Sequence, residues 1–520
     1  MAARLRIEVV DHATSGRLVL SVLARTLVRC LADANEVERL LRALPTDVSD
    51  PALTSLLALL NAVPSRDLVR PTLETSRLCA VADPAVLEQV AVLYNAVQEH
   101  DPTVPALPFH AVPTLYGLVA GALPLFSAIN IFDLIPVPEV WRHVTLQAHT
   151  KVVGGFYSAS SVDDFAAWTA NMIEVKLVDQ DGSTWQNIAR LLQSCPKLRS
   201  ITYVSRAVDG APTADTSAFC TALATSQLRT LSLSKLNASP RALDALAQAL
   251  LQSRTLTTLT IYQMPALWDH LLRDDGPSFP VQLASLDVAA ITAEHLMRLV
   301  RKLTTTRLRT LHWREAIDVT DAAMTLDSLP ELTSLTIQNV ILETFPLLLR
   351  LRHLHVLSAT VNHATMQAIG QLMATSSVLE TVRVHGCLYV DGPPAAMIRA
   401  LPAFFGRAGT ALTLDVFGPQ GAAALAQAMT RTRHTAEVTL KVCAAQLLLD
   451  DATRGLLDAL AHCARMTLVV EGDSDQSDAL VAHAETLGLQ PHIQVGPPRD
   501  DESAPRYRLR CKVPIGGVEA

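Results

Sequence analysis

Short apolar alternations recur through the middle of this chain, and each is followed by a run with helical periodicity. Residues 228–233, LRTLSL, place leucines at their first, fourth and sixth positions, which makes one face of a short strand apolar. Residues 242–251, ALDALAQALL, place Leu243, Leu246 and Leu250 on one face of a helix. Together the two runs predict one strand–turn–helix unit.

The strand pattern repeats at regular intervals along the chain. The clearest copies begin 24 to 28 residues apart, at Leu228, Leu256, Leu283, Leu308 and Leu332. Weaker copies begin at Trp141, Met172, Leu198, Leu351, Leu379, Ala411, Thr435, Cys463 and Gln490. This repetition predicts an α/β solenoid over residues 140–495, with parallel strands on the concave face and helices on the convex face.

The array resembles leucine-rich repeat proteins, and its spacing is similar to that of the ribonuclease-inhibitor-like class. That family places Asn or Cys three residues after the last apolar strand position, where the side chain satisfies loop backbone groups. Cys387 and Cys443 stand at this position, whereas the units with Met264 and Val340 depart from it. The resemblance implies a non-enzymatic surface for binding proteins.

Residues 1–139 show no repeat and predict an all-helical N-terminal domain with frequent prolines. Within it, residues 18–45 contain two leucine-rich helical runs. This pair resembles the F-box, a module that recruits a cullin-type ubiquitin ligase through its adaptor, and residues 32–37 stand where that family has its central turn. The resemblance implies a substrate receptor whose adaptor-binding residues are Leu23, Leu27, Leu31 and Val37.

The F-box resemblance has departures that leave other interpretations open. The usual opening Leu-Pro is replaced by Val19-Leu20, and a long segment separates the helix pair from Trp141. A second register of the F-box pattern would open at Leu44-Pro45. An ordinary helical cap on a plain leucine-rich repeat scaffold, without any ubiquitin role, is the alternative function.

Polar residues between the strand leucines are predicted to face the concave side. Most are Thr or Ser, but between Leu311 and residue 385 they change to six cationic or titratable residues: His312, Arg314, His353, His355, Arg383 and His385. Neighbouring strands lie about 4.8 Å apart, so His355 and Arg383 should be neighbours. The cluster predicts a docking surface for an acidic segment of a partner protein.

Two other interpretations of this cluster remain. A zinc site is one of them, but no carboxylate or thiolate is predicted to join the cluster, and the strand that carries Thr336 separates His312 from the other residues. We therefore predict no bound metal. The second alternative is a solvated polar face that has no dedicated partner.

Charge and motif content exclude several classes of function. The 43 basic and 50 acidic residues give a net charge of −7, so no basic excess indicates nucleic-acid binding. No phosphate-binding loop, metalloprotease helix, hydrolase elbow or kinase signature is present. We therefore expect no enzyme and no cofactor. A GTPase-activating leucine-rich repeat protein is the enzyme-linked alternative. It would need an arginine on a strand-end loop that reaches a nucleotide, and the sequence singles out no such arginine.

The eight cysteines show no metal or redox spacing, which predicts reduced core residues of a cytoplasmic or nuclear protein.

Three less regular segments lie along the chain. Residues 102–132 lack charged side chains, but Pro113 and Pro124 favour a buried helix pair over a membrane span. Residues 496–520 predict a polar linker followed by a C-terminal edge strand over 507–513. An insertion over 268–277 predicts a loop.

Overall fold

The computed structural model divides into two compact units, Met1–Ala249 and Leu250–Ala520, and the boundary falls within helix α11 (Pro240–Gln252). The structure describes residues 34–44, 51–62, 73–74, 90, 96–99, 128–132, 145–146, 151–156, 166–179, 184–205, 216–235, 238–274, 276–315, 318–389, 395–407, 410–416, 418–431, 438–444, 450–463, 466–473, 477–496 and 506–512.

The first described elements of the first unit are a packed helix pair, α2 (Ala34–Ala43) and α3 (Pro51–Ala62). The guanidinium of Arg42 donates to the Asn61 side-chain oxygen at 3.3 Å and thereby joins the two helices. The apolar positions of α3 are buried, namely Ala52, Leu53, Leu56, Leu59 and Leu60. Hydrophobic burial therefore helps to hold this pair in place.

A parallel ladder follows in the first unit, and each strand pairs with the next along the sequence. Helices α9 (Thr184–Ser194) and α10 (Ser217–Thr225) and the 3-10 helix η3 (Ala166–Asn171) lie between strands. The strands are β1 (Leu73–Glu74), β2 (Ala96–Glu99), β3 (Ala128–Phe132), β4 (Lys151–Phe156), β5 (Met172–Asp179), β6 (Ser200–Ser205) and β7 (Thr230–Ser234).

Strands β1 to β3 correct the prediction that residues 1–139 are all helical. They belong to the same ladder as β4, and β3 occupies the end of the uncharged 102–132 segment, where a helix pair was predicted. Most of the expected first repeat strand at 141–146 lies outside the described residues; the described residues 145–146 are not in a strand, and β4 begins at Lys151. Short apolar runs such as 128–132, AINIF, do not distinguish a buried strand from a helix by periodicity.

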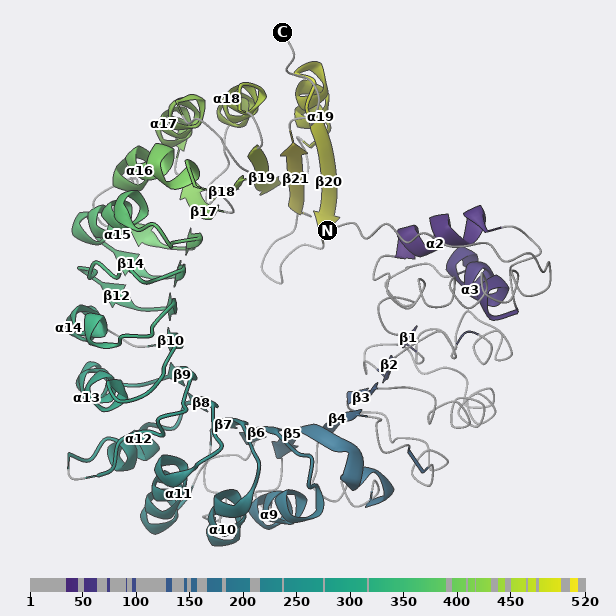
Figure 1. Cartoon of the computed structure of the whole chain (residues 1–520). Helices are drawn as coiled ribbons and strands as arrows, with labels where there is room; N and C mark the ends of the chain where they lie inside the picture. Colours follow the sequence, from purple (N-terminus) through teal and green to yellow (C-terminus); the bar gives the residue numbers. More distant parts are fainter. Residues whose placement is uncertain are drawn as a thin grey trace, which may run out of the picture. The chain divides into compact units, whose positions relative to one another are not determined.

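The second unit contains the regular part of the array. Nine strands of the main sheet pair in parallel in sequence order. Three short strands form a separate small sheet, namely β12 (Ile341–Leu342), β14 (Thr360–Val361) and β16 (Leu388–Tyr389). In this unit the strands line the inner side of the curved sheet and the helices its outer side (Figure 1). The nine strands are β8 (Thr258–Tyr262), β9 (Ser285–Ala289), β10 (Thr310–Arg314), β11 (Ser334–Gln338), β13 (His353–Leu357), β15 (Thr381–His385), β17 (Ala411–Val416), β18 (Val438–Ala444) and β19 (Met466–Asp473).

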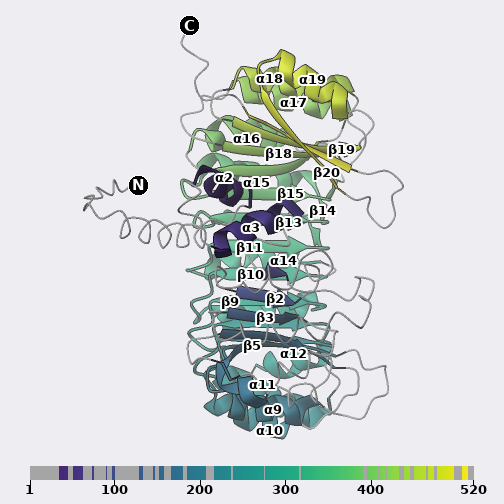
Figure 2. The ribbon, with the colours of Figure 1, turned by 90° about the vertical axis from the view of Figure 1, so that its right-hand side faces the viewer.

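Strand alternation explains how this sheet is built. In β10, Leu311 and Trp313 are buried, whereas Thr310, His312 and Arg314 are partly exposed. The same buried and partly exposed alternation recurs in β8, β13 and β15. Successive strands appear as rungs of one ladder in the turned view (Figure 2). The predicted α/β repeat solenoid with parallel strands is thus confirmed for this unit.

The helices on the outer side vary in length along the second unit. The interval between β11 and β13 contains no helix, and it is also the shortest, because only 19 residues separate Ser334 from His353. The predicted loop over 268–277 is partly wrong, because Trp268 is buried in a helix. The helices are α12 (Pro265–Leu271), α13 (Ala293–Leu303), α14 (Thr320–Met324), α15 (His363–Thr375), α16 (Ala395–Phe405), α17 (Gly418–Thr430), α18 (Asp450–Ala461) and α19 (Ser477–Thr486), together with the 3-10 helix η4 (Leu326–Ser328).

In the main sheet, the residue directly after each of seven strands has a positive φ angle, between 51° and 67°; these strands are β7, β8, β9, β10, β11, β13 and β15. A non-glycine residue in this conformation costs about 1–2 kcal/mol. The turn is supported by an added hydrogen bond, because the backbone N–H of Ser358 donates to the carbonyl of His385 at 2.8 Å, and Asn339 donates to Leu357 at 3.0 Å. With the like bonds of Ala290 and Glu315, the ladder therefore extends one residue beyond β9, β10, β11 and β13.

The two cysteines that carried the family pattern differ in the structure. Cys387 is buried, and its thiol donates to the carbonyl oxygen of Val356 at 3.5 Å, which is the role that the resemblance implies. Cys443 lies inside β18, so its predicted position in a loop is wrong. Burial raises the pKa of the Cys195 and Cys463 thiols to about 11, so both are protonated near neutral pH. These two are buried free thiols, as predicted for reduced core residues.

The C-terminal strand corrects another prediction. Strand β21 (Arg506–Lys512) forms within the predicted region, but it pairs antiparallel with both β19 and β20 (Gln490–Gly496). It is therefore an interior strand rather than an edge strand. Among the described residues, no helix has the length and apolar character needed to cross a membrane.

Candidate functional site

Strands β10, β13 and β15 bring the six predicted residues to one face of the sheet. We call them the histidine–arginine patch: His312 and Arg314 on β10, His353 and His355 on β13, and Arg383 and His385 on β15. His355 is the direct register partner of Arg383, as predicted. On its other side, His355 pairs with Thr336 of β11, which in turn pairs with His312. The predicted separation of His312 by one strand is also confirmed.

All six side chains are partly exposed, because the strand alternation places their apolar neighbours underneath. The side chain of His312 is 31% exposed, and those of Arg314 and His353 are each 41% exposed. Leu354, Val382 and Val384 are fully buried on the opposite face of β13 and β15. The patch thus rests on a rigid apolar layer and faces solvent.

A carboxylate on the neighbouring strand neutralises one end of the patch. Asp287 of β9 is the register partner of His312. Its Oδ2 atom accepts a hydrogen bond from the Arg314 guanidinium at 2.7 Å and lies 3.6 Å from His312 Nδ1. The prediction that no carboxylate joins this cluster is therefore wrong. Asp287 occupies the same strand position as His312, so its own repeat pattern could have revealed it.

A second carboxylate, that of Glu380, lies beside His353, the first residue of β13. Glu380 Oε1 is 3.1 Å from the Arg352 guanidinium, and its Oε2 is 3.9 Å from His353 Nε2. All three side chains are substantially exposed, so solvent screens this network and it contributes little to stability. Its effect is to lower the positive charge around His353.

The centre of the patch is His355 with Arg383. Arg383 has no carboxylate partner among the described residues, and its Nε atom is buried without a hydrogen-bond partner. Burial lowers the pKa of His355, and the positive charges of Arg383, His353 and His312 lower it further. A bound anion would oppose that effect and would also neutralise Arg383. The centre can therefore bind an acidic group, whereas Arg314 already has one.

We expect the Arg383→Ala variant to raise the pKa of His355 toward its ordinary value of 6.5, because a neighbouring positive charge is removed. The value should stay below 6.5, since burial is the largest cause of the shift. Histidine side-chain NMR titration of the full chain measures this change. Arg383→Lys keeps the charge and should leave the pKa low; an unchanged value in Arg383→Ala would contradict the assigned coupling.

The predicted adaptor-binding residues are not brought together in the described structure. Leu23, Leu27 and Leu31 lie outside the described residues. Val37 lies on α2 and is fully buried. The contact of these four residues with an adaptor stays a prediction.

In the described part of the chain, no group of three or more histidine, cysteine or acidic residues is arranged to hold a metal ion.

Comparisons with known proteins add little to this geometry. No protein-family model matches the chain, and no curated protein matches it. One solved structure, a Bacteroides fragilis protein from a structural genomics programme, is similar at 10% identity with a TM-score of 0.22, and the match covers 62% of this chain and 74% of that one. A similarity this low carries no argument about function, so the site rests on its own residues.

Proposed function

We propose that this chain is a non-enzymatic recognition protein of the leucine-rich repeat type, and that its sheet binds an acidic segment of a partner protein. The observation that supports this best is the central pair of the patch. His355 and Arg383 are adjacent, partly exposed and positively charged or titratable, and they lack a carboxylate partner among the described residues. A carboxylate-rich segment would supply the missing charge.

The arrangement favours an extended segment over a compact ligand. The patch extends over several neighbouring strands of a solvated sheet, and neighbouring strands lie about 4.8 Å apart. An acidic chain that crosses the strands would meet His312, then His355, then Arg383. Electrostatic complementarity of this kind determines specificity and association rate more than affinity. We therefore expect moderate, salt-dependent binding.

We expect the double variant His355→Ala with Arg383→Ala to bind an acidic probe at least about 10-fold more weakly, equal to about 1.4 kcal/mol. The probe is a fluorescein-labelled decaglutamate peptide, and fluorescence polarisation measures its affinity for the full chain. Arg301→Ala is the matched control, because Arg301 is an exposed arginine on α13, outside the sheet. Equal affinity of the double variant and the unmodified chain would contradict the proposal.

The pH dependence of this binding follows from His355. Bound carboxylates stabilise its protonated form, so binding should tighten as the pH falls from about 7.5 toward about 5.5. The free protein should respond in the opposite direction: because the fold lowers the pKa of His355, its stabilising contribution is present above the unfolded pKa and is lost as the pH falls through the folded pKa. Affinity that does not change with pH would remove His355 from the binding surface.

The F-box resemblance extends this proposal to a substrate receptor of a cullin-type ubiquitin ligase, in the cytoplasm or nucleus. What supports it is the helix α2, which lies where the second helix of that module was predicted. The full chain should then capture the purified ligase adaptor, and a variant with Leu23, Leu27 and Leu31 all changed to Asp should not. Absence of capture by the unmodified chain would favour the plain scaffold.

A further inference from the structure

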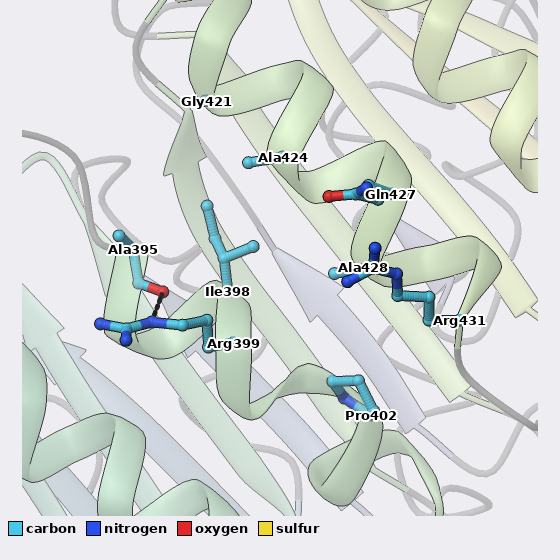
Figure 3. Close-up of a pocket in the computed structure, with 9 residues that line it drawn as sticks. All are labelled: Ala395, Ile398, Arg399, Pro402, Gly421, Ala424, Gln427, Ala428 and Arg431. Atoms are coloured by element: carbon cyan, nitrogen blue, oxygen red, sulfur yellow. Dashed lines mark hydrogen bonds between the residues drawn. The ribbon is translucent and has the colours of Figure 1, made fainter.

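The outer side of the second unit contains an open groove between α16 and α17 (Figure 3). Its volume is 280 Å³. Nine residues line it, and most contribute apolar atoms: Ala395, Ile398, Arg399, Pro402, Gly421, Ala424, Gln427, Ala428 and Arg431. The groove lies on the helix layer, whereas the histidine–arginine patch lies on the sheet.

The groove exists because α17 presents small residues to its neighbour. Gly421, Ala424 and Ala428 recur at spacings of three and four, so they share one face of α17. Across from them, α16 contributes Ile398 and the ring of Pro402 (Figure 3). Small side chains on one wall and branched or cyclic ones on the other leave room that the two helices do not fill.

Two arginines give the groove a positive charge. Arg399 on α16 and Arg431 at the end of α17 are both exposed and both belong to the lining. Arg399 donates from Nε to the carbonyl oxygen of Ala395 at 3.3 Å, which leaves its terminal N–H groups available. Neither arginine has a carboxylate partner among the described residues. The lining therefore matches an apolar surface that is flanked by negative charge.

We propose that this groove binds an amphipathic, acidic helix of a partner protein. Helices bind such grooves through apolar side chains at i, i+3 or i+4, and i+7, and carboxylates beside that apolar stripe would pair with Arg399 and Arg431. The volume lies below the range of about 300–1,000 Å³ that is usual for small-molecule sites, and the groove is open. An open groove suits a row of side chains from a macromolecule better than a small molecule, which usually binds in a more enclosed cavity.

The probe for this proposal is a lactam-stapled, fluorescein-labelled helical peptide with leucines at i, i+4 and i+7 and glutamates on both flanks. Fluorescence polarisation with the full chain should show binding. A peptide with lysines in place of the glutamates, and one with serines in place of the leucines, should each bind at least about 10-fold more weakly. Equal binding of the serine peptide would overturn the proposal, because charge alone would then explain the affinity.

Two variants test the groove itself. Arg399→Glu with Arg431→Glu reverses the charge, and Ala424→Trp fills the space from an exposed position without entering the core. Each should lower the affinity of the chain for the acidic leucine peptide at least about 10-fold. Arg301→Glu on α13 should change that affinity less than about twofold. Unchanged affinity in both groove variants would refute the site.

Other occupants would give different results, and each would overturn the helix proposal. If the groove binds a fatty acid instead, the peptide should bind weakly and dodecanoate should displace it. A second copy of this chain would show itself as a dimer in analytical ultracentrifugation that Ala424→Trp dissociates. The His355→Ala with Arg383→Ala variant should leave peptide binding unchanged, so failure at the groove is separate from failure at the histidine–arginine patch.

Discussion

We expect Trp313→Ala to lower the free energy of unfolding of the second unit by about 3–5 kcal/mol, the usual range when a buried tryptophan is truncated. Trp313 is fully buried on β10, and its register partners are Val288 on β9 and Ile337 on β11. All three are fully buried, so a cavity there removes packing from three neighbouring strands at once. In a solenoid, each repeat depends on contacts with its neighbours.

The matched control is Trp313→Phe. The buried Nε1 atom of Trp313 has no hydrogen-bond partner, so phenylalanine removes an unsatisfied donor while it keeps most of the apolar volume. We expect this variant to lose less than about 1.5 kcal/mol. Because a long repeat array need not unfold in one step, hydrogen exchange of the β9, β10 and β11 amides should accompany urea unfolding followed by circular dichroism. Equal losses in both variants would show that the lost apolar volume does not cause the destabilisation of Trp313→Ala.

The success of sequence reasoning at β10 has a simple physical origin. Strand positions alternate between two faces, so the apolar Leu311 and Trp313 share one face, which is buried, and His312 between them lies on the other. Identical strand patterns in adjacent repeats also fix the register, which explains why the pairing of His355 with Arg383 could be predicted without coordinates. Local rules are sufficient where the repeat is regular.

The same local rules failed where a neighbouring strand or an irregular repeat decides the outcome. The ion pairs of Asp287 and Glu380 form through contacts with residues of β10 and β13, which the sequence of one repeat by itself does not specify. The sequence predicts an edge strand over 507–513. Instead, Leu509 and Cys511 are buried while Arg510 between them is exposed, so the alternation marks one solvated face of an interior strand.

The close packing of α15 against α16 leads to the second large expected effect, a destabilisation in Gly370→Ala. A Cβ atom at Gly370 would lie 2.8 Å from the carbonyl oxygen of Ala396 and 2.9 Å from its carbonyl carbon. These are backbone atoms, so the two helices would have to move apart. Overpacking of this kind costs about 1–3 kcal/mol, which exceeds the gain of up to about 1 kcal/mol when alanine replaces a helical glycine.

Gly455 in α18 is the matched control for this effect, because a Cβ atom there meets nothing within 4 Å. With no clash to offset the helix preference of alanine, Gly455→Ala should stabilise the unit by about 0.5–1 kcal/mol. The two variants make the same chemical change in two helices of one unit, so the helix preference of alanine cancels and their unfolding free energies should differ by the overpacking cost of about 1–3 kcal/mol. Urea unfolding of both, with hydrogen exchange in α15 and α16, measures the difference. Stabilisation by both alanines would mean that α15 and α16 are not in backbone contact at Gly370, and the convex layer next to the α16–α17 groove would then be more loosely packed than the structure indicates.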